Sequence, residues 1–176
     1  RDLPDVERRV EIMGSRSFLN LDNIDYLQSL HIEEMDSLIV GSFSQTDIEL
    51  SCIDQNQREL PYMAKFRLAN ERYFPAHNLK IVAGSARMLN ENEVVINEKF
   101  ARRAFGEENP IGLFIGINKG LEKEYQTYRI AGVVSGKVYS EEIHTDIYFP
   151  LTYLPNSAFT VQTTVKELNQ GSKNPD

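Results

Sequence analysis

Apolar and polar residues alternate along much of the chain, and this period of two residues is typical of strands that bury one face. The clearest example is Phe159–Val165, in which Phe159, Val161 and Val165 share one side. Similar patterns predict strands at residues 6–12, 37–40, 47–54, 62–68, 79–83, 93–96, 113–117, 125–134 and 146–151. The sequence therefore predicts an α+β fold with a β-rich middle.

A first helix is predicted near the N-terminus, where either Asp22 or Asn23 is a candidate N-cap. Apolar and long side chains then recur at helical spacing, at Ile24, Leu27, Gln28 and His31. A short helix or turn, interrupted by Pro75, is expected at residues 70–78.

A further helix is predicted at residues 98–105, between an N-cap at Asn97 and a stop at Gly106. Its buried face is expected to consist of Phe100, Ala101, Ala104 and Phe105. A turn should follow at residues 109–112, because Asn-Pro-Ile-Gly cannot continue a helix.

The 176-residue chain has a formal net charge of −7, and its acidic residues are unevenly distributed. Residues 1–60 contain 13 acidic and 5 basic side chains, a net of −8, so the remaining 116 residues sum to +1. A nucleic-acid surface needs Lys and Arg to replace the counterions of the phosphates. We therefore expect no nucleic-acid partner and interpret the acidic stretch as a solvated face.

The single cysteine, Cys52, lies on the apolar side of a predicted strand, where a thiol is a small buried hydrophobic group. A nucleophilic cysteine needs a lowered pKa and a nearby base, and neither is evident in the neighbouring sequence. The histidines, His31, His77 and His144, do not have the spacing of zinc ligands. A site built from His31, Glu33 and Glu34 is an alternative that we do not favour, so no metal is expected.

Glycines at 112, 116 and 120 resemble a phosphate-binding loop only superficially, because they do not open a helix after a strand. We interpret Gly112, Gly116 and Gly120 as bulge and turn positions. Adjacent acids are expected to be ordinary surface groups, at Glu33/Glu34, Glu107/Glu108 and Glu141/Glu142. We therefore predict no enzyme activity, no catalytic residue and no cofactor.

No run of 18 apolar residues occurs, and the N-terminus lacks the pattern of a signal peptide. The abrupt ends, residues 1–4 and 170–176, are expected to be cuts within a longer polypeptide.

Four segments, taken in order, resemble the MacB-like periplasmic core domain of FtsX-family ABC transporter permeases. The longest is residues 93–112, a strand followed by Asn-Glu, a short Ala-rich helix, Phe-Gly and Asn-Pro-Ile-Gly. The others are an aromatic pair before a strand that ends in Gly, a Val-x-Gly-Val-Val-like strand and a late aromatic-Pro strand, at residues 70–84, 128–134 and 146–151. The resemblance covers about residues 70–151 well and residues 1–69 only by the order of elements.

The resemblance implies two lobes. A porter-like (ferredoxin-like) α+β lobe near the membrane would contain residues 1–45 and 155–176, and a β-rich outer lobe with a short helix would contain residues 46–154. Family members usually continue with a further helix and strand after the last porter-like strand, which implies that this lobe is incomplete here.

The resemblance also implies an extracytoplasmic, non-enzymatic domain of a permease at the periplasmic face of the bacterial inner membrane. It would couple cytoplasmic ATP hydrolysis to export, or to a partner outside that membrane. Its implied partners are an ATPase subunit, reached through the full-length permease, and a periplasmic adaptor, lipoprotein or peptide cargo. It would meet the membrane only through transmembrane helices outside this chain. The alternatives are a passive partner-docking or regulatory domain that transports no cargo and, less favoured, a hydrolase or metalloenzyme.

Overall fold

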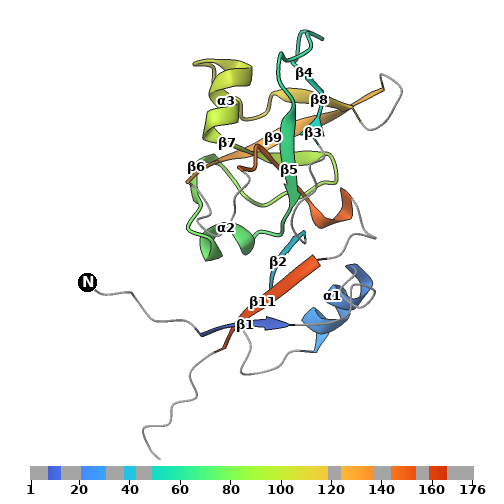
Figure 1. The fold of residues 1–176 in the computed structure, drawn as a ribbon, viewed down its shortest axis with the longest axis vertical. Coiled ribbons are helices and arrows are strands. Elements are labelled where there is room, and N and C mark those ends of the chain that lie inside the picture. Colours follow the sequence, from blue (N-terminus) through green and yellow to red (C-terminus); the bar gives the residue numbers. More distant parts are fainter. Residues whose placement is uncertain are drawn as a thin grey trace, which may run out of the picture.

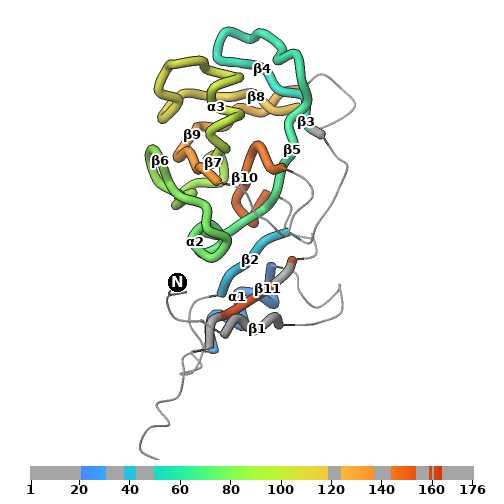
Figure 2. The backbone as a smooth tube through the Cα atoms, turned by 60° about the vertical axis from the view of Figure 1, so that its left-hand side comes forward, coloured from blue at the N-terminus to red at the C-terminus, as the bar shows by residue number. Residues whose placement is uncertain are grey.

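A computed structural model describes residues 8–12, 21–30, 38–42, 49–118, 124–136, 144–153 and 159–165. It confirms the predicted α+β fold, with two sheets and short helices over these residues (Figure 1). Figures 1 and 2 both show the larger sheet with α2 and α3 in the upper part of the molecule. The smaller sheet and α1 lie below it, with β2 between the two parts.

The larger sheet has eight strands among the described residues, in the order β3-β5-β10-β7-β9-β8-β4, with β6 paired to β9. Their bounds are β3 (Glu49–Leu50), β4 (Cys52–Ile53), β5 (Ala64–Leu68), β6 (Lys80–Gly84), β7 (Glu93–Asn97), β8 (Phe114–Asn118), β9 (Tyr125–Ser135) and β10 (Ile147–Phe149). Only Ser51 separates β3 from β4, although these strands stand at opposite ends of the order. The sheet therefore curls until its two ends meet.

The prediction of one strand at residues 47–54 was wrong, because the described part of this segment is divided between two partners. β3 pairs antiparallel with β5, whereas β4 pairs antiparallel with β8. Gly116 on β8 permits this approach, since a Cβ there would lie 2.4 Å from the Ile53 side chain. A one-residue transfer between strands leaves no trace in an alternating pattern.

The long strand β9 organises the curled sheet, because three strands share its two edges. β7 pairs parallel with its second half on one edge. On the other edge, β8 pairs with residues 125–129 and β6 with residues 132–135. This sharing explains why β9 has 11 residues where β7 has five.

The smaller sheet has three antiparallel strands among the described residues, in the order β1-β11-β2. Their bounds are β1 (Arg8–Ile12), β2 (Ile39–Ser42) and β11 (Phe159–Val165), and the helix α1 (Leu21–Ser29) accompanies them. Arg8 stands opposite Val165, so the described chain enters and leaves this sheet on neighbouring strands at the same end.

The structure confirms the predicted bounds of one helix and contradicts the predicted start of another. α3 (Glu98–Phe105) has the predicted bounds: the Asn97 side chain accepts a hydrogen bond from the Lys99 N–H at 2.9 Å, and Gly106 follows at φ +62°. α1 begins at Leu21, so the prediction of Asp22 or Asn23 as its N-cap was wrong. Asp22 lies instead in the first turn, where a carboxylate favours the helix dipole.

Pro75 lies within the short helix α2 (Tyr73–Ala76), and the one-turn helix η1 (Leu151–Tyr153) follows β10. The main apolar core fills the inside of the curled sheet and continues under the small sheet and α1. A second cluster of buried side chains packs around α2, at Ile39, Ala69, Tyr73, Phe74, Leu79, Ala86, Val95, Val134 and Tyr148.

The buried face of α3 is narrower than predicted. Phe100 and Ala101 are buried, whereas Ala104 and Phe105 are only half-buried. Phe100 packs edge-to-face against Tyr62 with a centroid distance of 6.0 Å. The expectation that Phe105 is buried was therefore wrong, because this last residue of the helix packs against the rim of the core and stays partly exposed.

We predict that Phe100→Ala lowers the free energy of unfolding by about 3–5 kcal/mol, the usual cost of removing a fully buried phenyl ring. Phe105→Ala is the matched control on the same helix and should cost clearly less. Urea unfolding followed by circular dichroism measures both. Equal losses for the two variants would contradict the packing described here.

Candidate functional site: the junction between the two sheets

The two sheets are joined along β2, which has hydrogen-bonding partners on both edges. β11 pairs with one edge. On the other edge, Gly41 forms an isolated antiparallel bridge with Ala69, and the Asn70 N–H donates to the Val40 carbonyl at 3.0 Å. The Ala69 N–H in turn donates to the Phe149 carbonyl at 3.0 Å. Backbone hydrogen bonds therefore run from β11 through β2 and residues 69–70 to β10.

The side chain of Asn70 supplies the central contacts of this junction. Its Nδ2 donates to the Leu38 carbonyl at 2.8 Å, and its Oδ1 accepts from the Val40 N–H at 3.0 Å. One side chain amide thus pairs with a donor and an acceptor of β2, as a peptide group of a neighbouring strand would. Because Leu38 and Val40 are buried, these backbone groups would otherwise be costly to leave unpaired.

Two further contacts strengthen the junction at the end of β2. The Ser42 Oγ accepts from the Leu68 N–H at 3.1 Å, and the Ser42 carbonyl accepts from the Arg67 Nη1 at 3.0 Å. Gly41 allows Tyr73 to lie against the strand, because a Cβ at this position would lie 2.8 Å from the buried tyrosine ring. The junction is therefore directional and closely packed.

Cys52 is fully buried, which confirms its interpretation as a small hydrophobic group. Burial, and secondarily the charge of Asp146, raises the pKa of the Cys52 thiol from 9.0 to about 12. Its Sγ donates weakly to the Leu50 carbonyl at 3.7 Å. A thiol in this environment stays protonated at neutral pH and is a poor nucleophile.

The structure does not bring the candidate metal ligands together. The His77 ring lies against Tyr73 with a centroid distance of 4.2 Å, whereas His144 lies 3.6 Å from the Asp146 carboxylate. His31, Glu33 and Glu34 lie outside the described residues. Within the described ranges, no three His, Cys, Asp or Glu side chains are arranged to hold a metal ion.

The other candidate positions have local structural roles where the structure describes them. Gly112 has φ +84° in the turn before β8, and Gly116 gives room to Ile53, as set out above. Glu107 and Glu108 are exposed after α3. Gly120, Glu33/Glu34 and Glu141/Glu142 lie outside the described residues.

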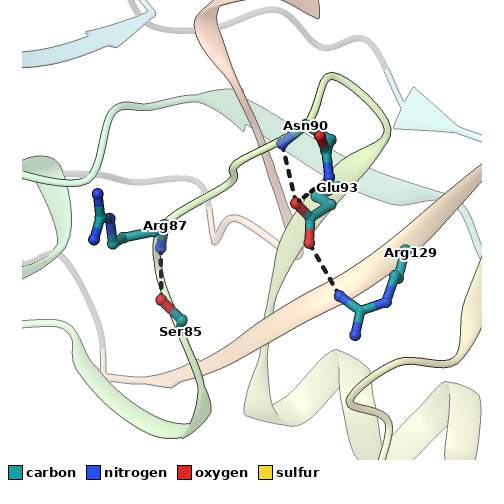
Figure 3. A network of polar contacts seen from close by, with 5 residues as sticks. All are labelled: Ser85, Arg87, Asn90, Glu93 and Arg129. Atoms are coloured by element: carbon teal, nitrogen blue, oxygen red, sulfur yellow. Dashed lines mark hydrogen bonds and ion pairs between the residues drawn. The ribbon is translucent and has the colours of Figure 1, made fainter.

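Sequence reasoning missed two buried carboxylates, Glu93 and Asp146, both of which are hydrogen-bonded. Glu93 accepts from the N–H and Nδ2 of Asn90 at 3.0 and 3.2 Å and from Arg129 at 3.0 Å (Figure 3). It therefore fixes the turn before β7 to β9, while Ser85 orders the same loop by accepting from the Arg87 N–H.

Asp146 ties β10 to β5, because its Oδ2 accepts from the Lys65 N–H at 2.9 Å. Asn90 is only three residues from Glu93, but Arg129, which also binds Glu93, and Lys65, which binds Asp146, lie 36 and 81 residues away in the sequence. No local pattern could have identified these two long-range contacts.

No helix in the described part of the chain is long and apolar enough to cross a membrane. Residues 8–172 match the model of a family described as MacB-like periplasmic core domain. Among curated proteins, none matches the sequence.

Solved structures with a similar fold include these three. A domain of a protein assigned as a permease from Porphyromonas gingivalis has a TM-score of 0.70 at 15% identity, over 97% of this chain and 81% of that one. The periplasmic region of MacB from Actinobacillus actinomycetemcomitans has a TM-score of 0.63 at 18% identity, over 93% and 76%. The extracellular domain of the noncanonic ABC-type transporter YknZ from Gram-positive bacteria has a TM-score of 0.59 at 13% identity, over 93% and 86%.

We predict that Asn70→Ala lowers the free energy of unfolding by about 1–3 kcal/mol, because it leaves buried backbone groups of β2 unpaired. Denaturant unfolding should show this loss. Asn92→Ala is the control and should cost clearly less, because the Asn92 amide is exposed and accepts its hydrogen bond from the exposed Gln126 side chain at 3.2 Å. Equal effects of the two substitutions would show that the junction does not hold the sheets together.

We also predict a pH dependence that originates at Cys52. The folded thiol keeps its proton up to about pH 12 and the unfolded thiol loses it above pH 9.0, so stability is full below pH 9 and falls as pH rises through this interval. The stability advantage of the native chain over Cys52→Ala should shrink by up to about 1.4 kcal/mol per pH unit above pH 9. Urea unfolding of both proteins between pH 8 and 10 measures this. A constant difference would contradict the raised pKa.

Proposed function

The chain belongs to the MacB-like periplasmic core domain family, and on this premise we propose that it couples ATP hydrolysis in the cytoplasm to work outside the inner membrane. Members of this family are periplasmic parts of ABC transporter permeases, which work with an ATPase, and such domains are generally not enzymes. The location proposed for this chain is accordingly the periplasmic face of the bacterial inner membrane.

We assign the three-stranded sheet and α1 to a membrane-proximal, porter-like lobe of residues 1–45 and 155–176. The curled sheet would form the outer lobe of residues 46–154. The neighbouring positions of β1 and β11 support this assignment, because movement of two membrane helices could enter the small sheet together.

The observation that carries the proposal is the two-sided pairing of β2. A movement of the small sheet has a hydrogen-bonded route into the large one, through Val40, Asn70 and Phe149. Hydrogen bonds of this kind resist sliding and separation, whereas a purely apolar contact would allow the sheets to slip. The domain is thus suited to act as a rigid lever toward an adaptor, lipoprotein or peptide cargo.

The second candidate is a passive docking or regulatory domain that transports no cargo. It would need the same fold, but it would have no need for the outer lobe to follow the ATPase cycle. Nucleotide-dependent movement of the outer lobe therefore distinguishes the two functions.

We predict that ATP shifts the outer lobe relative to the bilayer. A fluorophore at Phe114→Cys, in a Cys52→Ala background, would report energy transfer to labelled lipid headgroups in the full-length permease with its ATPase. Phe114 is suitable because its side chain is 49% exposed on β8. Asn70→Ala should keep ATP hydrolysis while the ATP-responsive population falls by about fivefold or more, as expected for couplings of about 1–3 kcal/mol.

The control for this experiment is Asn92→Ala, which should respond to ATP like the native protein. If energy transfer in the native permease does not change with ATP, the lever is wrong and the passive docking domain is favoured. If Asn70→Ala responds as the native protein does, force does not pass through the junction.

A further inference from the structure

The strand β6 has an open edge in the described structure. Its pairing there is with β9 alone, so the backbone groups of its other edge have no strand partner among the described residues. Figures 1 and 2 both show β6 at the margin of the large sheet. An open strand edge of this kind is a template for pairing with another extended chain.

The side chains of this edge are unusually apolar for an exposed strand. Ile81 is 45% exposed and Val82 is 51% exposed, and Leu89 in the following loop is 74% exposed. By contrast, all five residues of β7 are buried. Natural edge strands are usually protected by charges or proline, and in Lys80–Gly84 only the first residue is charged.

The register shift at Val82 interrupts pairing to β9 between Ile81 and Ala83. A bulge often redirects a side chain at a functional position. Val82 is exposed although Leu79, directly before the strand, and Ala86, two residues after it, are buried.

We propose that β6 docks an extended segment of a different protein, which adds as a strand and carries apolar residues together with an acidic one. The acidic residue is inferred from Lys80, which is exposed and has no ion pair within the described residues. Arg87 adds positive charge beyond the strand, although Glu71 lies 3.5 Å from it. At contact distance Lys80 and Arg87 attract an acidic residue more strongly than the net charge of −7 repels it, because salt screens the more distant charges over about 8 Å.

A second copy of this chain is the less suitable occupant. A pairing of five residues buries far less than the roughly 1,200 Å² of a stable dimer interface. Recognition of an extended segment of another protein does not need an interface of that size, because backbone pairing and side chain contacts suffice for it.

This docking edge deepens the proposed function and rests on it for its biological meaning, since it names the kind of partner that the outer lobe would engage. The test uses a phage-displayed library of randomised nonapeptides selected on the 176-residue chain. Val82→Lys is the counter-selection, because it replaces the exposed apolar side chain in the middle of β6 by a charged one and so removes the apolar contact with the partner. Phe114→Ser is the control, because it removes an exposed aromatic ring from β8 and not from β6.

We expect enriched peptides that alternate apolar residues and contain Asp or Glu. Their affinity should fall by roughly tenfold or more in Val82→Lys and stay unchanged in Phe114→Ser. Lys80→Glu should shift the selection toward basic peptides. Binding should slow hydrogen exchange of the amides in residues 80–84. N-methylation of alternate amides of the peptide should abolish binding.

The proposal is overturned if no sequence is enriched over the Val82→Lys chain, or if N-methylated peptides bind equally well. It is also overturned if sedimentation shows that β6 pairs two copies of the chain. Failure of the proposed coupling function can be distinguished from failure of the docking proposal. If only the coupling function fails, peptides still bind at β6 while ATP leaves the outer lobe unmoved.

Discussion

The amide of Asn70 takes the place of a peptide group beside β2, and the connection between the two sheets depends on this substitution. A three-stranded sheet with one short helix has little core of its own, and Ile24, Val40 and Phe159 pack into the same cluster as the side chains inside the curled sheet. Apolar packing of this kind does not fix how the two sheets are oriented relative to each other. The hydrogen bonds of Asn70 fix this orientation, because both backbone groups that they satisfy belong to buried residues and would be costly to leave unpaired.

A second constraint is that β3 and β4, at opposite ends of the strand order, have to lie next to each other. The chain passes from β3 to β4 through Ser51, whose carbonyl accepts from the Asn118 N–H at 2.9 Å. Buried carboxylates reinforce neighbouring strands, with Asp146 between β10 and β5 and Glu93 between β7 and β9. The buried polar side chains named here thus hold strands in place. The Cys52 thiol is likewise protonated and unreactive.

Two local features could be predicted from the sequence to the residue, whereas the start of α1 could not. The Asn97 cap and Gly106 stop set the bounds of α3, and the alternation of Phe159–Val165 matches β11. Features that depend on distant partners could not be predicted. The division between β3 and β4 follows from which strands lie alongside them, and Asn70 pairs with backbone groups 30 and 32 residues away. The family was nevertheless identified, because its motifs consist of caps, turns and strand ends.

The junction and the edge strand belong to one continuous ladder. From β11 it passes through β2, residues 69–70, β10, β7 and β9, and it ends at β6. A partner strand at β6 would lengthen this ladder by one member without disturbing the rest. Because strand pairing is stiff along the hydrogen bonds, movement of β1 and β11 would then reach the docked segment along this ladder, with the Asn70 side chain holding β2 to the large sheet. The same physical interaction would therefore serve both attachment of a partner and transmission of force to it.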